Sequence, residues 1–123
     1  SNLQDPDFCK NFKPLPSDSE LVQNIRDYIL QNLDVPLPPL KEIAKKFGTN
    51  EFKIKKGFRH FHNISLFQFY NEQRLSKAHS LILQTKYSLG DISAMCGYTD
   101  YVNFYKAFKK HFQYPPSSLK RHI

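Results

Sequence analysis

Two lysine-rich stretches of this chain, residues 50–62 and 100–112, also carry apolar side chains at positions that a helix would expose to water. These side chains are Phe52, Tyr101 and Val102. Lysine ammonium groups bind phosphates or guanine, whereas an aromatic or apolar side chain suits thymine methyl groups and sugar edges. Because a merely solvated surface rarely carries such side chains, the combination predicts contact with a nucleic acid.

A helical register gives each stretch one core face and one outer face. At about 100° per residue, Phe104, Phe108 and Phe112 stack on one side of the second helix, while Val102 and Lys106 face away. In the first helix the inner row is Ile54, Phe58 and Phe61, the outer row is Phe52, Lys56 and Arg59, and the flanks hold Lys53, Lys55 and His60. The inner rows predict core packing, and the outer rows supply the candidate ligand contacts.

Each of these helices follows a shorter predicted helix, so that residues 42–58 and 91–108 look alike. Each pair has a small residue, Ala44 or Ser93, at the centre of the shorter helix, and then a glycine in the turn. The small residue permits close helix approach, and the glycine permits positive φ. This is the helix-turn-helix pattern, and its two copies lie about 50 residues apart.

The formal net charge of +7 on 123 residues is concentrated in the same two places. Residues 41–62 carry a net charge of +5 and residues 98–123 a net charge of +4, whereas residues 1–40 carry −3. A basic excess by itself is weak evidence for a polyanionic partner. Its coincidence with both helix-turn-helix patterns favours DNA.

Other classes of protein are disfavoured. No run of about 20 apolar residues predicts a membrane span, and no secretory signal opens the chain, so we expect a cytoplasmic protein. No acid/base pair, nucleophile elbow or phosphate-binding glycine loop is present, so we expect neither catalysis nor a cofactor. Cys9 and Cys96 cannot make a zinc site, and His60 and His62 lack metal-ligand spacing, so no metal is expected. We expect the two histidines on the surface and Cys96 in the core.

The periodicity predicts an all-α protein of about seven helices. We expect two homeodomain-like helix-turn-helix lobes joined by a long connecting helix. The predicted segments are a linker over 1–17, the first lobe over 18–64, the connecting helix over 65–86 and the second lobe over 87–123. About 20 helical residues span roughly 30 Å, close to the roughly 34 Å between successive major grooves. One chain would then place two recognition helices in adjacent grooves.

Capping residues predict where the helices begin. Ser17 with Glu20 and Ser65 with Gln68 form capping boxes, and single caps are expected at Asn50, Ser88 and Asp100. Amides at the helix starts marked by Ser65 and Ser88 are candidate phosphate contacts. Asn63 would end the first recognition helix in a left-handed conformation.

Together these motifs resemble the C-terminal DNA-binding domain of the AraC/XylS transcription regulators, over roughly residues 18–122. The most specific part is Arg74-Leu75-x-x-Ala78, Asp91-Ile92, Gly97-Tyr98-x-Asp100, Phe104-x-x-x-Phe108-Lys109-x-x-Phe112 and Pro116-x-x-Leu119-Lys120. The resemblance implies binding to double-stranded promoter DNA and contact with RNA polymerase. It also implies an effector-binding N-terminal domain that this chain lacks.

Carried over by position, the resemblance assigns roles to the outer residues. The base-reading residues would be Phe52, Lys55 and Lys56 in the first lobe, and Tyr101, Val102, Asn103 and Lys106 in the second. The phosphate contacts would be Lys53, Arg59, His60, Lys109, Lys110, Ser65 and Ser88. For Arg74 a phosphate contact and a salt bridge to a lobe are both open, with the structural role favoured.

A narrower resemblance concerns the first lobe. Residues 38–40 and 50–58 are similar to the pyochelin-regulator subgroup, which responds to iron siderophores, and this similarity would account for Gly57 within a helix. The chain departs from the family at Asn63 and Gln113, where glycine is usual. A second class of function stays open, namely a basic helical module that binds protein, RNA or an anionic surface without base specificity.

Overall fold

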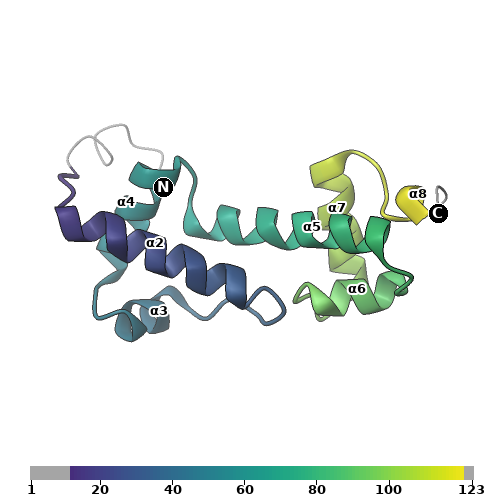
Figure 1. Ribbon diagram of the computed structural model, residues 1–123, viewed down its shortest axis with the longest axis horizontal. Coiled ribbons are helices and arrows are strands. Elements are labelled where there is room, and N and C mark those ends of the chain that lie inside the picture. The colour runs from purple at the N-terminus through teal and green to yellow at the C-terminus, as the bar shows by residue number, and fades with distance from the viewer. Residues whose placement is uncertain (1–11, 121–123) are drawn as a thin grey trace. The chain divides into compact units, whose positions relative to one another are not determined.

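The computed structural model describes residues 12–120, and every regular element in this range is a helix (Figure 1). The elements are α2 (Pro16–Gln31), α3 (Leu40–Lys46), α4 (Glu51–His62), α5 (Leu66–Gln84), α6 (Leu89–Met95), α7 (Tyr101–Phe112) and α8 (Ser117–Lys120). The prediction of an all-α fold with about seven helices is confirmed for the described residues. Cys9 and most of the predicted linker over 1–17 lie outside them.

The chain divides into two compact units. The first holds the described residues up to Gln31 together with Leu37–Phe69, and the second holds Asn32–Pro36 together with the described residues from Tyr70 onward. The first turn of α5 therefore belongs to the first unit, and the rest of α5 to the second. Each unit contains one short helix, one turn and one longer helix, namely α3–α4 or α6–α7.

The small residues and glycines of both helix pairs have the predicted roles. Ala44 and Ser93 are buried, while Gly48 and Gly97 have φ values of +67° and +83°. At Gly97 an added Cβ would lie 2.7 Å from the Leu33 carbonyl oxygen, so both the turn and the neighbouring backbone require glycine.

Four of the predicted caps are confirmed. The side chains of Asn50, Ser65, Ser88 and Asp100 accept hydrogen bonds from the amides of Lys53, Gln68, Asp91 and Val102, at 2.8–3.0 Å. The residues that follow α4 and α7 and cap their C-terminal ends are Asn63 and Gln113, whose φ values are 63° and 69°. Gln113 adopts the left-handed conformation in place of the usual glycine, and its Nε2 donates to the Lys110 carbonyl at 2.8 Å.

The start of α2 differs from the prediction. Ser17 was expected to cap the helix, but α2 begins at Pro16, and Ser17 lies inside it. Proline is favoured at the first helical position because its missing amide is not needed there. Asp18 reaches back instead, and its Oδ2 accepts the Leu15 amide at 2.7 Å. Its Oδ1 lies 3.2 Å from the ammonium of Lys53 on α4.

The core of the second unit is built by α5, α6 and α7. Its buried residues are Leu75, Ala78, Ile82, Ile92, Cys96, Phe104 and Phe108. Burial of each of these phenylalanines contributes roughly 1.5–3 kcal/mol, so the Phe row fixes the rotation of α7 about its axis. Cys96 is fully buried as predicted, and desolvation raises the pKa of its thiol to about 11.

Arg74 has the structural role, although no salt bridge provides it. Its guanidinium lies over the rings of Tyr70 and Tyr98, donates to the Gly97 carbonyl at 3.3 Å and to Asn71 Oδ1 at 2.6 Å. Arg74 therefore ties α5 to the turn of the second helix pair through a carbonyl and aromatic faces.

In the first unit α2 packs against α4 (Figure 1), and Gly57 of α4 faces Val22 of α2. A Cβ on Gly57 would lie 2.9 Å from Cγ2 of Val22, which is closer than real side chains allow. This contact accounts for a glycine in the middle of α4, where glycine otherwise costs about 1 kcal/mol.

Gly57→Ala should therefore destabilise the protein by about 1 kcal/mol or more, because the overpacking against Val22 outweighs the gain in helix propensity. Gly90→Ala is the matched control, since the nearest atom to its added Cβ is 3.9 Å away. Urea denaturation should show Gly90→Ala neutral or stabilising. If Gly57→Ala matched Gly90→Ala, close approach would not explain the glycine.

Asp18→Asn should lower the free energy of unfolding by about 1 kcal/mol at pH 7, because it removes the ion pair with Lys53. The hydrogen bond from Leu15, with help from Lys53, lowers the pKa of Asp18 from its usual 3.8. A carboxylate with a lowered pKa stabilises the fold above that value and loses its contribution as the pH falls further.

The stability difference between the wild-type protein and Asp18→Asn should therefore shrink progressively as the pH falls below 3.8, as measured by urea denaturation at each pH. Asp27→Asn, on the exposed side of the same helix, should change stability by less than about 0.5 kcal/mol at any of these pH values. A difference that persisted unchanged at low pH would show that the charge of Asp18 does not contribute.

Candidate DNA-binding surface

The outer face of α7 carries all four predicted base-reading residues of the second unit. Tyr101 and Val102 are 40% and 53% exposed, and Asn103 and Lys106 are also exposed. Phe104 and Phe108 on the opposite face are fully buried. The Asp100 cap holds the Val102 amide at 2.8 Å, so the first turn of α7 has a fixed geometry. A recognition helix reads bases mainly from this end.

The sequence analysis missed Tyr105 on the same face. Its side chain is 36% exposed and lies one helical turn after Tyr101, which is the signal that would have identified it. Burial raises the pKa of the Tyr101 hydroxyl, and the nearby Tyr105 adds a smaller effect in the same direction. The Tyr101 phenol is therefore neutral at pH 7 and can donate a hydrogen bond. Lys109 and Lys110, the predicted phosphate contacts, are exposed further along α7.

The outer face of α4 agrees with the prediction at two positions. Phe52 is 57% exposed, and Lys55 is exposed beside it. Arg59 is half-buried, and the exposed His60 packs its ring against the rings of Phe12 and Phe61, with centroids 5.7 and 4.8 Å apart.

The prediction that Lys56 faces solvent is wrong. Only 4% of Lys56 is exposed, and its ammonium lies 5.1 Å from the centroid of the Phe52 ring. The physical reason is that α4 is covered on more than one side, so its buried residues include Lys56 and Gly57 next to Phe58. A helical wheel assumes a single buried face.

Lys53 is also engaged within the unit, because its ammonium pairs with the buried carboxylate of Asp18 at 3.2 Å. The predicted phosphate contact would have to compete with this pair. Ser65 and Ser88 use their hydroxyls as helix caps, which leaves their helix-start amides as the candidate phosphate contacts.

His62 is not the surface histidine that was expected. Its ring lies against Phe58 and Phe69, with centroids 4.7 and 6.3 Å apart. Burial, followed by the nearby charge of Arg26, lowers the pKa of this imidazole. His62 is therefore neutral at pH 7 and part of the packing between α4 and α5.

None of the groups of three or more His, Cys, Asp or Glu side chains among residues 12–120 has a geometry that could hold a metal ion. Within the same range, no helix is both long and apolar enough to cross a membrane.

Comparison with known proteins connects this surface to a family. A family described as a helix-turn-helix domain matches residues 43–122. The Xylose operon regulatory protein of Haemophilus influenzae is 31% identical over 79 residues, which are 64% of this chain and 20% of that protein. The chain thus spans about a fifth of the length of this relative.

Solved structures share the fold. The C-terminal domain of AraT, a response regulator from Geobacillus stearothermophilus, superposes with a TM-score of 0.80 at 24% identity, over 85% of this chain and 87% of that one. The DNA-binding domain of AdpA, solved in complex with a target DNA, superposes with a TM-score of 0.75 at 17% identity, over 82% of this chain and 90% of that one. Because the family match covers more than half of the chain, the protein belongs to the AraC-type helix-turn-helix domains, the DNA-binding domains of transcription regulators.

Proposed function

We propose that the chain reads promoter DNA with α7 as its main base-reading helix and α4 as a second, weaker reader. The observation that carries this proposal is the outer face of α7, where Tyr101 and Val102 are exposed beside Asn103 and Lys106. An amide side chain pairs with adenine, a lysine with guanine, and an apolar group with the thymine methyl. Three kinds of base contact are thus available on one rigid helix.

The first unit presents fewer exposed side chains to DNA. Of its predicted base-reading residues, Phe52 and Lys55 are exposed, whereas Lys56 is buried. Lys53 is held by Asp18. We infer that α4 contributes apolar contact through Phe52 and one cation through Lys55, while the lysines of α7 carry more of the electrostatic attraction.

Both helices would enter major grooves of one duplex. α5 has 19 residues, about 28 Å at 1.5 Å per residue, and contributes to both units. Successive major grooves lie about 34 Å apart. These lengths support recognition of an asymmetric site by one chain, without a two-fold dimer.

The proposal extends to the whole regulator. The Haemophilus relative is a regulatory protein of an operon, and it is about five times as long as the matched segment. We propose that this domain recruits RNA polymerase at promoters on the bacterial nucleoid, under the control of a further effector-binding domain. We propose no catalytic role. The siderophore-responsive subgroup remains a prediction.

The test is selection of binding sites from a random duplex pool, followed by fluorescence anisotropy with the selected duplex and a scrambled one. Lys106→Ala and Val102→Ala should weaken binding to the selected duplex by roughly fivefold to a hundredfold and narrow its preference over the scrambled one. Lys110→Ala should weaken binding to both duplexes equally. It should also reduce the number of ions released on binding, measured from the salt dependence of the affinity, by about one.

Lys86→Ala is the matched control, because Lys86 is exposed but lies outside the recognition helices, and it should change little. Each of these side chains is exposed, so the melting temperatures should stay within about 2 °C of wild type. Failure of the selection to enrich any sequence at moderate salt would favour the alternative, a basic module without base specificity.

A further inference from the structure

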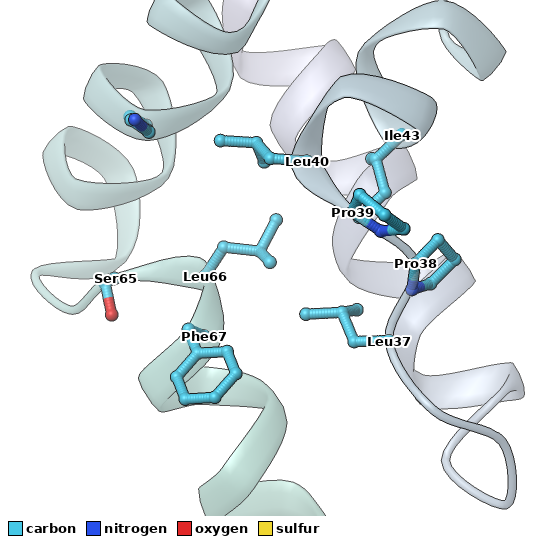
Figure 2. A pocket seen from close by; sticks show the side chains of 9 residues that line it. Leu37, Pro38, Pro39, Leu40, Ile43, Ser65, Leu66 and Phe67 are labelled. Carbon is cyan, nitrogen blue, oxygen red and sulfur yellow. The ribbon is translucent and has the colours of Figure 1, made fainter.

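A pocket of about 380 Å³ opens in the first unit, next to the recognition helix α4 (Figure 2). It lies between the segment that leads into α3, the outer residue Lys55 of α4, and the first turn of α5. Small-molecule sites have volumes of about 300–1,000 Å³, so the pocket lies at the lower end of that range. Lys55 and the start of α5 at its edge are also candidate DNA contacts, but the apolar interior of the pocket has no part in the DNA binding proposed above.

Apolar side chains from two directions form the walls. Leu37 and Leu40 extend from one side toward Leu66 on the other, as Figure 2 shows, and Pro39 and Phe67 complete the walls. Phe67 is 63% exposed, which is a large apolar surface for a residue in the first turn of a helix. An occupant of the pocket would remove this surface from water, and that burial would drive binding.

The polar groups at the pocket are positive or donate hydrogen bonds. Lys55 is the charged residue in its lining, and none of the carboxylates among residues 12–120 lines it. The amides of Leu66 and Phe67 occupy the first two positions of α5, where a helix has no internal acceptor for them. The Ser65 hydroxyl caps the Gln68 amide and so does not neutralise this end of the helix. The positive end of the α5 dipole adds to the charge of Lys55.

We propose that this pocket binds a small amphipathic carboxylate, with its apolar body between Leu40, Leu66 and Phe67 and its carboxylate near Lys55 and the start of α5. At roughly 30 Å³ per water-sized group, the volume suits a ligand of about a dozen non-hydrogen atoms. Charge complementarity selects an anion over a cation or a neutral molecule of the same shape.

Occupancy has a consequence for DNA binding that rests on the proposed function. Lys55 lines the pocket and is also one of the exposed residues of α4 proposed to contact DNA. A carboxylate that holds Lys55 withdraws this cation from the DNA and adds a negative charge beside the duplex. The ligand therefore weakens binding through α4 and leaves the α7 contacts in place.

The direct test uses decanoate below its micelle concentration and follows backbone amide resonances in the absence of DNA. Saturable shifts confined to residues 37–43, 55 and 65–67 are the expected result. 1-Decanol and decyltrimethylammonium, which share the tail, should bind at least about fivefold more weakly. Shifts without saturation, or shifts spread over both units, would overturn the proposal.

Two variants locate the contacts. Phe67→Ser should weaken decanoate binding by about tenfold or more, and Lys55→Met by roughly fivefold with little effect on decanol. Leu83→Ser is the matched control, because Leu83 is an exposed apolar residue of the same helix that belongs to the second unit. It should bind decanoate like the wild type. An equal loss of decanoate affinity in Leu83→Ser, or no loss in Phe67→Ser, would contradict the proposed site.

A second arm measures duplex binding with and without saturating decanoate. The selected duplex should bind wild type a few-fold more weakly in decanoate, whereas Phe67→Ser should be insensitive to it. If decanoate binds but the affinity for DNA does not change, the pocket is a binding site for the carboxylate, and the proposal that it weakens DNA binding through Lys55 is wrong. If the chain selects no DNA sequence, the amide titration still tests the pocket alone.

Discussion

Burial of one apolar row on each longer helix decides which side chains of that helix can reach a ligand. Phe104 and Phe108 are fully enclosed in the core of the second unit, as Phe58 is in the first. A helix cannot rotate without exposing these rings, and each ring contributes roughly 1.5–3 kcal/mol. The outer faces are therefore fixed by hydrophobic burial, and the polar residues on them need not stabilise the fold.

The two units use this arrangement differently. α7 is covered on one face, so Tyr101, Val102, Asn103 and Lys106 all remain available. α4 is covered more widely, because α2 packs closely against it at Gly57. Two of its lysines are engaged inside the unit, one with Asp18 and one over the Phe52 ring. Two copies of one sequence pattern thus present unequal binding surfaces.

The partial covering of α4 also accounts for the apolar pocket beside it. Residues 37–43 and the start of α5 approach α4 without filling the space in front of Leu66 and Phe67. Lys55 is left at the boundary between this pocket and the proposed DNA surface. A single cation in that position couples the two proposed sites by charge, with no change in the fold required.

The sequence alone determined the features that depend on near neighbours in the chain. The caps at Asn50, Ser88 and Asp100 and the positive φ of Gly48 and Gly97 follow from spacings of a few residues. The burial of Phe58, Phe104 and Phe108 follows in the same way. The exposure of Phe52, Tyr101 and Val102 follows from the same periodicity.

Only the tertiary structure decided the features whose partners are distant in the chain. Lys53 meets Asp18 across 35 residues, and Gly57 makes room for Val22 on another helix. The burial of Lys56 and the packing of His62 against Phe69 likewise depend on how helices pack around α4. Helical periodicity gives the direction of each side chain from its own axis, but not which directions other helices will cover.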